Sequence, residues 1–265
     1  MTATTVRRPT IELLSAVDGT HVAVVAPTIA GVVAGMGLVD AGAAPAPAGM
    51  WIPQVADGDE VDAGTPLLEL HGTATELGVA EDHAMGVLGF AGGIARRASE
   101  LVKAAPPGLR VVCGGWKKLP ASLKPVLRAG LDVAGVGHRL VDGPFVYVPK
   151  THVRLLGGVG AAVRAAAALD RGRPAVQVTS VAEARQALEA GARILMVDTG
   201  NLGDLAAVDE AMRTDGLRDE ALLAFGGGVT DAQLDAAAGA GADAVDVGRA
   251  VLDAPLWDLH VEVVT

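Results

Sequence analysis

The feature that most constrains the fold is an alternation of short apolar runs with alanine-rich stretches from about Arg110 onward. Seven runs have the β-branched character of buried strands, namely RVVC, LDVAGV, FVYV, PAVQVT, RILMVD, LLAFGG and DAVDVG. Between them the sequence predicts helices over 119–129, 157–170, 180–190, 203–213 and 230–240. This pattern is typical of parallel strands with helices outside. We therefore expect an α/β fold with a βα barrel of about seven strands, one short of the usual eight.

Two of the predicted helices begin with a capping signal. Ser180 is followed three residues later by Glu183, and Thr230 is followed by Gln233 in the same way. These pairs are capping boxes, which mark helix starts. Each places a loop between the carboxyl end of a strand and a helix, which is the face where βα barrels build their substrate sites.

The first hundred residues have a different pattern. GTHVAVVAP, GVVAGMGLV and TPLLELHG are predicted strands separated by Gly, Pro and Asp clusters, and 74–104 is predicted to be one long helix. Pro106 and Pro107 cannot continue that helix and mark a boundary. We expect an N-terminal α/β sandwich domain over 1–107 and the barrel over 108–265, with the last residues able to return to the N-terminal domain.

Composition excludes several classes of protein. The chain is 51% hydrophobic, but it has no run of about eighteen apolar residues that would span a membrane. Its N-terminus lacks the pattern of a secretory signal, so we expect a cytoplasmic protein. A net charge of -10 argues against nucleic-acid binding. The single cysteine, Cys113, excludes an intrachain disulfide and is interpreted as a small buried residue.

The charge is unevenly distributed along the chain. Residues 103–154 hold nine Lys and Arg against two acids, a net +7, whereas the other residues hold 12 basic against 29 acidic, a net -17. A focused positive potential concentrates small polyanions in a cleft. The basic segment therefore suggests a polyanionic ligand, with a solvated helix face as the alternative.

Two glycine turns follow the last two predicted strands, where barrels often bind phosphate through backbone N–H groups. FGGGVT supplies Gly226 and Gly227, and VGRA supplies Gly248 together with Arg249, a forked donor for phosphate. The alternative is that these glycines only make tight turns. Together they favour a phosphate site.

Polar residues at the ends of other strands form a second candidate cluster. Asp198 ends the strand RILMVD and is a candidate to bind a ribose hydroxyl or, through water, a magnesium ion, with helix capping as its alternative role. The planar guanidinium of arginine and the ammonium of lysine together suit a ligand with carboxylates or phosphates. The candidates of this kind are Lys117, Lys118, His138, Arg139, Lys150 and His152.

Several linked motifs resemble the quinolinate phosphoribosyltransferase family. They are GVVAG at 31–35, the DGDEVDAG turn, GGIA, GHRL, VTS-x-x-EAR-x-ALEAGA with its MVD end, GGG-x-T and GAD-x-V-x-VG-x-A, all in family order over roughly 31–263. The resemblance implies transfer of phosphoribose from phosphoribosyl pyrophosphate to quinolinate with Mg²⁺, followed by loss of carbon dioxide. It also implies a homodimer in which the N-terminal domain of one subunit completes the partner's site.

The residues expected to hold the acceptor depart from the family pattern. At positions where the family has two arginines, a lysine, a glutamate and a serine, this chain has Trp116, Asp82, Pro149, Gln177 and Phe225. Losing cations opposite a dicarboxylate weakens its binding. The positions that differ from the family are therefore those expected, by the resemblance, to bind quinolinate.

These observations predict a divergent type II phosphoribosyltransferase-like enzyme that uses phosphoribosyl pyrophosphate or a related sugar phosphate. Its acceptor would be small and planar but not quinolinate, and Trp116 could stack on it. By resemblance, Lys117, Lys150 and Asp198 are the catalytic candidates. Two alternatives are a non-catalytic dimeric paralogue that acts as a small-anion-binding or regulatory module, and a quinolinate enzyme with rewired contacts.

Overall fold

The computed structural model describes residues 9–42 and 50–264 of the chain. Its contacts divide the chain into two compact units. The first unit contains residues up to 98 together with 119–134 and 254–265, and the second contains 99–118 and 135–253. Within the described residues, no helix has the length and apolar character needed to span a bilayer.

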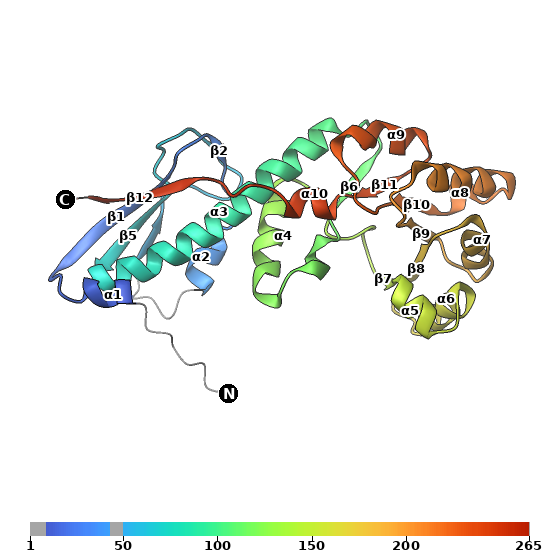
Figure 1. Ribbon diagram of the computed structural model, residues 1–265, viewed down its shortest axis with the longest axis horizontal. Helices are drawn as coiled ribbons and strands as arrows, with labels where there is room; N and C mark the ends of the chain where they lie inside the picture. Colours follow the sequence, from blue (N-terminus) through green and yellow to red (C-terminus); the bar gives the residue numbers. More distant parts are fainter. Residues whose placement is uncertain (1–8, 43–49, 265) are drawn as a thin grey trace. The chain divides into compact units, whose positions relative to one another are not determined.

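The first unit is built on an antiparallel sheet of order β12-β1-β5-β3. Its strands are β1 (Thr20–Pro27), β3 (Trp51–Pro53), β5 (Leu68–Thr73) and β12 (Leu259–Val264), and β2 (Gly31–Val32) pairs separately with β4 (Glu60–Val61). The helices are α1 (Pro9–Leu14), α2 (Met36–Gly42), α4 (Lys124–Val133) and the part of α3 (Ala74–Ala104) up to residue 98, with a 3₁₀ turn at Ala121–Leu123. Figure 1 shows α3 lying along the sheet, and buried side chains of α3, β1 and β5 share one core.

The long helix α3 has the bounds predicted from the sequence. Its start is fixed by Thr73, whose backbone N–H donates to the Glu76 carboxylate over 2.8 Å while the Glu76 N–H donates to the Thr73 hydroxyl over 3.4 Å. These reciprocal bonds form a capping box. Halfway along, Gly92 leaves room for the Trp257 ring, which a Cβ at this position would contact at 2.5 Å.

The second unit contains a six-stranded parallel sheet of order β6-β11-β10-β9-β8-β7. The strands are β6 (Arg110–Val112), β7 (Phe145–Val148), β8 (Arg173–Val178), β9 (Ile194–Val197), β10 (Leu222–Phe225) and β11 (Ala244–Asp246). The helices are α5 (Lys150–Leu155), α6 (Val159–Ala167), α7 (Val181–Glu189), α8 (Leu202–Thr214), α9 (Leu234–Gly239) and α10 (Gly248–Leu252). The α/β fold with a C-terminal βα barrel is confirmed.

The prediction of one strand of this barrel, at the run LDVAGV, was wrong. The run LDVAGV begins inside α4 and ends next to a single parallel bridge between Val112 and Gly137. The buried residues Val126, Leu127, Gly130 and Leu131 recur at helical spacing along α4, so the apolar run continues one helix face. The described part of the sheet therefore has six strands and not seven.

Both capping signals predicted in this unit lie at helix starts. The Ser180 hydroxyl accepts from the Glu183 N–H over 3.2 Å, although the Glu183 carboxylate accepts from the N–H and hydroxyl of Thr179 rather than from Ser180. Thr230 and Gln233 form the full reciprocal box at the start of a 3₁₀ turn (Asp231–Gln233), which directly precedes α9. These caps separate each strand end from the following helix.

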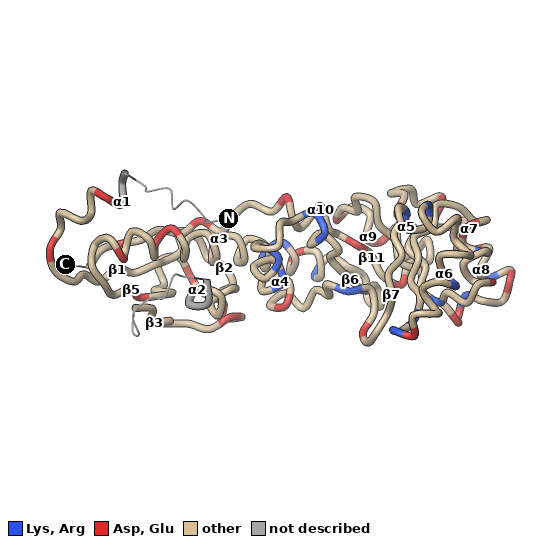
Figure 2. Tube along the Cα trace, turned by 90° about the horizontal axis from the view of Figure 1, so that it is seen from below, with Lys and Arg blue, Asp and Glu red and all other residues tan. Residues whose placement is uncertain are grey.

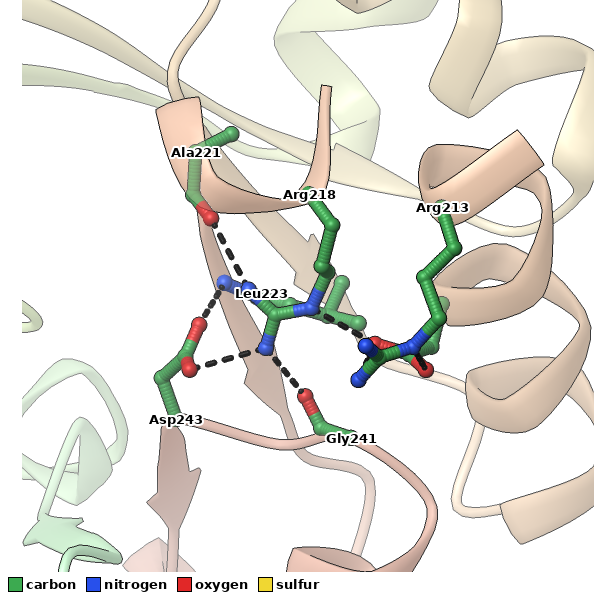
Figure 3. A network of polar contacts seen from close by, with 7 residues as sticks. Arg213, Arg218, Ala221, Leu223, Gly241 and Asp243 are labelled. Carbon is green, nitrogen blue, oxygen red and sulfur yellow. Dashed lines mark hydrogen bonds and ion pairs between the residues drawn. The ribbon is translucent and has the colours of Figure 1, made fainter. Parts of the chain in front are cut away.

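A charged network braces the amino ends of β10 and β11 (Figure 3). Arg218 donates to the Asp209 carboxylate over 2.6 Å and to the Asp243 carboxylate over 2.8 Å, and Asp243 in turn accepts from the Leu223 N–H over 2.7 Å. Burial by itself raises the pKa of Asp209, but the hydrogen bonds from Arg213 and Arg218 bring it below the ordinary value. The network stabilises the end of the barrel opposite to the carboxyl ends of the strands.

Candidate active site

A cavity of about 680 Å³ lies at the carboxyl ends of the strands of the second unit. Its lining residues come from the segments that follow β6, β9, β10 and β11, from β7 and β8, and from the loop at 138–140. Most of the site residues predicted from the sequence line it. They are Trp116, Lys117, Lys118, His138, Arg139, His152, Gln177, Asp198, Gly227, Gly248 and Arg249.

Basic residues gather around the same loops. Figure 2 shows Lys and Arg in blue around β6 and α10. Lys117, Lys118, Arg139 and Arg249 line the cavity, against the two carboxylates of Asp198 and Asp246. The basic segment noticed in the sequence therefore contributes to a cavity rather than only to a solvated helix face.

Three predicted site residues lie outside the cavity lining. Lys150 is exposed at the start of α5, and Asp82 is exposed on α3 in the first unit. Gly226 is buried, and its N–H donates to the Val197 carbonyl over 2.9 Å. The phosphate role of the Gly226 amide stays a prediction, and in this structure the N–H is used by the sheet.

The role of Gly226 is to leave space between two acids. A Cβ at this position would overlap the Met196 side chain and would lie 3.3 Å from Asp198 Oδ1 and 3.5 Å from the Asp246 Cβ. A side chain at this position would therefore crowd Met196 and both acids. The glycine thus keeps the two carboxylates accessible from one side.

Gln177 connects three neighbouring strand ends. Its Nε2 donates to Asp198 Oδ2 over 2.6 Å, and its Oε1 accepts from the Lys150 N–H over 2.7 Å. The amide group is therefore held in one orientation by β9 on one side and by the start of α5 on the other. Gln177 orients the Asp198 carboxylate, and Lys150 contributes through its backbone.

Lys117 lies over an aromatic ring. Its Nζ is 3.9 Å from the centroid of the Tyr147 ring and 5.9 Å from that of Trp116. Burial lowers the pKa of Lys117, while the charges of Asp246 and Asp198 oppose this shift. This is a cation–π arrangement in which the ammonium group faces the two acids.

Tyr147 was missed in the sequence. Burial and the nearby charges of Asp198 and Asp246 raise its pKa, so the phenol stays protonated. The strand FVYV carried the signal, because alternation places Phe145 and Tyr147 on the same face of β7. Both rings line the cavity, and Arg139 lies over Phe145 at 5.1 Å from its centroid.

Asp246, at the end of β11, was also missed. Its Oδ1 accepts from the Gly114 N–H over 2.8 Å and from the Gly248 N–H over 2.9 Å. Burial raises the pKa of Asp246, and these two hydrogen bonds lower it in part. The phosphate role of the Gly248 amide stays a prediction, and in this structure the N–H donates to a carboxylate of the chain itself. The sequence signal was the strand-terminal position that Asp246 shares with Asp198.

The Gly227–Gly228 turn supplies backbone donors at the cavity. Both residues have positive φ, at +103° and +97°, and both are exposed in the lining. Within residues 9–42 and 50–264 their N–H groups make no hydrogen bond. Arg249 is exposed nearby in the lining and pairs with Asp253 over 3.0 Å. The N–H groups of this turn are therefore available to bind an anion.

The side chains that line the cavity could hold a magnesium ion only together with ligands from a substrate. Among the described residues, no group of three or more His, Cys, Asp and Glu side chains is placed to hold a metal ion. Mg²⁺ in phosphate sites is commonly held by one or two carboxylates, with substrate phosphates and water completing the octahedron. Asp198 and Asp246 suit an ion that arrives with a phosphorylated ligand.

Cys113 precedes this site but does not contribute a nucleophile. The thiol is buried, and burial raises its pKa to about 11. At neutral pH it is protonated and therefore a poor nucleophile. The interpretation of Cys113 as a core residue is confirmed.

Comparison with known proteins identifies the family. Residues 94–262 match the quinolinate phosphoribosyl transferase C-terminal domain, and residues 10–91 match the N-terminal domain of the same family. The chain belongs to the quinolinate phosphoribosyl transferase family. Members of this family are phosphoribosyltransferases, which agrees with the enzyme class predicted from the sequence.

Among curated relatives, the chain is 24% identical to a probable nicotinate-nucleotide pyrophosphorylase (carboxylating) of Archaeoglobus fulgidus, over 78% of this chain and 81% of the relative. It is 31% identical to the human nicotinate-nucleotide pyrophosphorylase (carboxylating), over 73% of this chain and 66% of the relative. The structure of the Francisella tularensis nicotinate-nucleotide pyrophosphorylase covers 98% of this chain and 91% of its own, with a TM-score of 0.76 at 21% identity. That likeness supports the fold.

Proposed function

We propose that this chain transfers phosphoribose from phosphoribosyl pyrophosphate to a small planar acceptor other than quinolinate. The observation that carries the proposal is the aromatic wall of the cavity. The whole chain has three Trp, three Phe and one Tyr, and three of these seven residues, Trp116, Phe145 and Tyr147, line this one cavity. Such rings bind a flat ring by stacking and edge contacts.

The cations of the cavity argue against a dicarboxylate acceptor. Trp116 and Pro149 line the cavity at positions where the family resemblance predicts an arginine and a lysine. Two of the remaining cations, Lys117 and Arg139, lie over aromatic rings. Removing a cation opposite a desolvated carboxylate typically costs about 2–5 kcal/mol of binding free energy. Two such losses would make quinolinate a poor ligand.

The other end of the cavity supports a phosphoribosyl donor. Gly227, Gly228 and Arg249 offer backbone and guanidinium donors to a phosphate, and Asp198, oriented by Gln177, offers an acceptor to a ribose hydroxyl. Asp198 and Asp246 would hold a magnesium ion, which when bound would neutralise charge growing on the pyrophosphate leaving group. Lys117 adds a fixed positive charge beside both acids.

Titration calorimetry with phosphoribosyl pyrophosphate and Mg²⁺ tests the donor half of this proposal. We expect saturable binding that Asp198→Ala removes and Asp219→Ala, a change of the same charge at an exposed position outside the cavity lining, leaves intact. No binding of the donor at ~1 mM, the upper range of ordinary enzyme KM values, would refute it.

Product analysis tests the acceptor half. Pyrophosphate release, followed by phosphorus NMR across a panel of planar heterocycles, should appear with at least one compound that lacks two adjacent carboxylates. Carbon dioxide release from quinolinate should be absent, and efficient release would contradict the proposed acceptor.

A second candidate function is a non-catalytic binding module. It is favoured by Gln177, whose two polar ends are both used within the chain, and by Asp246, which occupies two backbone amides of the cavity wall. Donor binding without pyrophosphate release across the whole panel would favour this alternative.

The homodimer implied by the family resemblance is part of the same proposal. Light scattering after gel filtration should then give a mass twice the 26.6 kDa of the chain. A monomeric mass at concentrations where the donor binds would contradict a site completed by a partner.

A further inference from the structure

The carboxylate of Asp246 occupies a pair of backbone amides that belong to different loops. The Gly114 N–H, after β6, and the Gly248 N–H, after β11, both donate to Oδ1, over 2.8 Å and 2.9 Å. Convergent main-chain N–H groups of this kind bind anions, and hydrogen bonds to an ionised acceptor are stronger than neutral ones. Here the anion they hold is a side chain of the protein.

The space between this carboxylate and the two loops is closed. A Cβ at Gly248 would lie 3.1 Å from Asp246 Oδ1 and 3.0 Å from the Gly115 nitrogen, and a Cβ at Gly114 would overlap Asp246 Oδ2. The two loops are thus within contact distance of each other and of the carboxylate. No ligand oxygen can reach the Gly114 and Gly248 amides while Asp246 is bound to them.

A second negative charge reinforces the effect. Asp198 lies beside Asp246 across Gly226, and its charge acts on Asp246. Like charges at a binding surface disfavour an incoming anion and favour hydroxyl donors or a cation. This part of the cavity is therefore unlike the Gly227–Gly228 turn, whose amides make no hydrogen bond within the described residues.

We propose that Asp246 is a specificity-determining residue, whose carboxylate fills the Gly114–Gly248 amide pair and excludes an anionic group of the ligand from it. The cavity then binds phosphate at the Gly227–Gly228 turn and presents Asp246 and Asp198 to hydroxyl groups, as of a ribose. This inference rests on the proposed function only for the phosphorylated nature of the ligand. The amide pair itself can be tested with inorganic phosphate.

The test is a titration of the ¹⁵N-labelled full chain with inorganic phosphate, followed by amide NMR and calorimetry. In the unmodified protein we expect shifts at Gly227 and Gly228 and none at Gly114 and Gly248. In Asp246→Ala, the freed amides of Gly114 and Gly248 should shift on titration. The phosphate affinity should rise by about tenfold over that of Asp246→Asn, since two charge-assisted hydrogen bonds become available.

The asparagine variant separates charge from occupancy. Asp246→Asn keeps a side-chain oxygen as acceptor for both amides and removes the negative charge. Its gain in phosphate affinity over the unmodified protein should therefore be no larger than the gain of Asp198→Asn. Equal phosphate affinity of the alanine and asparagine variants, or shifts of Gly114 and Gly248 in the unmodified protein, would overturn the inference. Because the unmodified protein gives a decisive result, the test does not depend on the variants folding. If phosphoribosyl pyrophosphate did not bind, the proposed function would be refuted, but the amide shifts expected with inorganic phosphate would be unaffected.

Discussion

Replacing Gln177 by glutamate should reveal how closely the acids of the cavity are spaced. Gln177 Nε2 lies 2.6 Å from Asp198 Oδ2, so Gln177→Glu exchanges a hydrogen bond for two facing carboxylate oxygens. Coulomb's law at an effective dielectric of about 20 gives roughly 6 kcal/mol at this separation. Rotation of the side chain and access of water to the cavity reduce the net cost to about 2 kcal/mol, or about 1.5 pKa units on the new carboxyl.

The sign of the pH dependence follows from this repulsion. The pKa of the new carboxyl is raised in the folded state above its unfolded value of about 4.3, so the protonated form is favoured by folding. The destabilisation of Gln177→Glu is therefore absent at low pH and grows as the pH rises through the raised pKa. Thermal unfolding should show a loss of about 5 °C at pH 8 and about half of that loss at pH 5, which lies between the unfolded and the raised pKa.

Two controls complete the design. Gln177→Met removes the same hydrogen bonds without adding charge, so its cost should not change with pH. Millimolar Mg²⁺ should recover part of the stability of Gln177→Glu at pH 8 by lying between the carboxylates, and should do nothing for Gln177→Met. A loss for Gln177→Glu that is equal at both pH values would refute the proximity argument.

Three further outcomes are expected in unfolding experiments. Arg218→Ala should cost about 3 kcal/mol because it leaves the buried Asp209 with a single cation, whereas Arg213→Ala, at a side chain 57% exposed, should cost less than about 1 kcal/mol. Equal costs would show that the network is not centred on Arg218. Gly86→Ala, in open space on the exposed face of α3, should stabilise the protein by about 0.5–1 kcal/mol through helix propensity, and a loss would mean that this face is covered. Asp246 has a raised pKa in the folded state, so Asp246→Asn should gain stability relative to the unmodified protein as the pH rises and lose that advantage in acid.

Local signals made the first unit's long helix predictable. Thr73 and Glu76 start α3 and Pro106 lies just beyond its end, and each of these acts through residues close in sequence. The run LDVAGV was misassigned although it had a comparable signal. Gly135, at φ +68°, follows the end of α4 as a C-terminal glycine commonly does, but the β-branched residues before it suggested a strand.

The sequence predicted many of the residues that lie at the site, but it did not predict the hydrogen bonds between them. The barrel rule places strand-terminal side chains at one mouth, which is why Asp198, Lys117 and Arg139 were found. Which amides remain available to a ligand depends on partners from distant strands. The N–H of Gly226 is used by Val197, and only tertiary geometry decides this.

The pairing of β12 with β1 has a consequence for how the chain folds during synthesis. Thr28, just after β1, bonds to Asp258, 230 positions later, just before β12. At translation rates of about 5–20 residues per second, β1 leaves the ribosome roughly 10–50 s before its neighbour is made. During that time β1 can pair on only one side, with β5, and its other edge is open to unrelated strands. The first sheet to emerge is therefore the last to be completed, and the nascent chain is most exposed to mispairing over the interval in which the barrel is being synthesised.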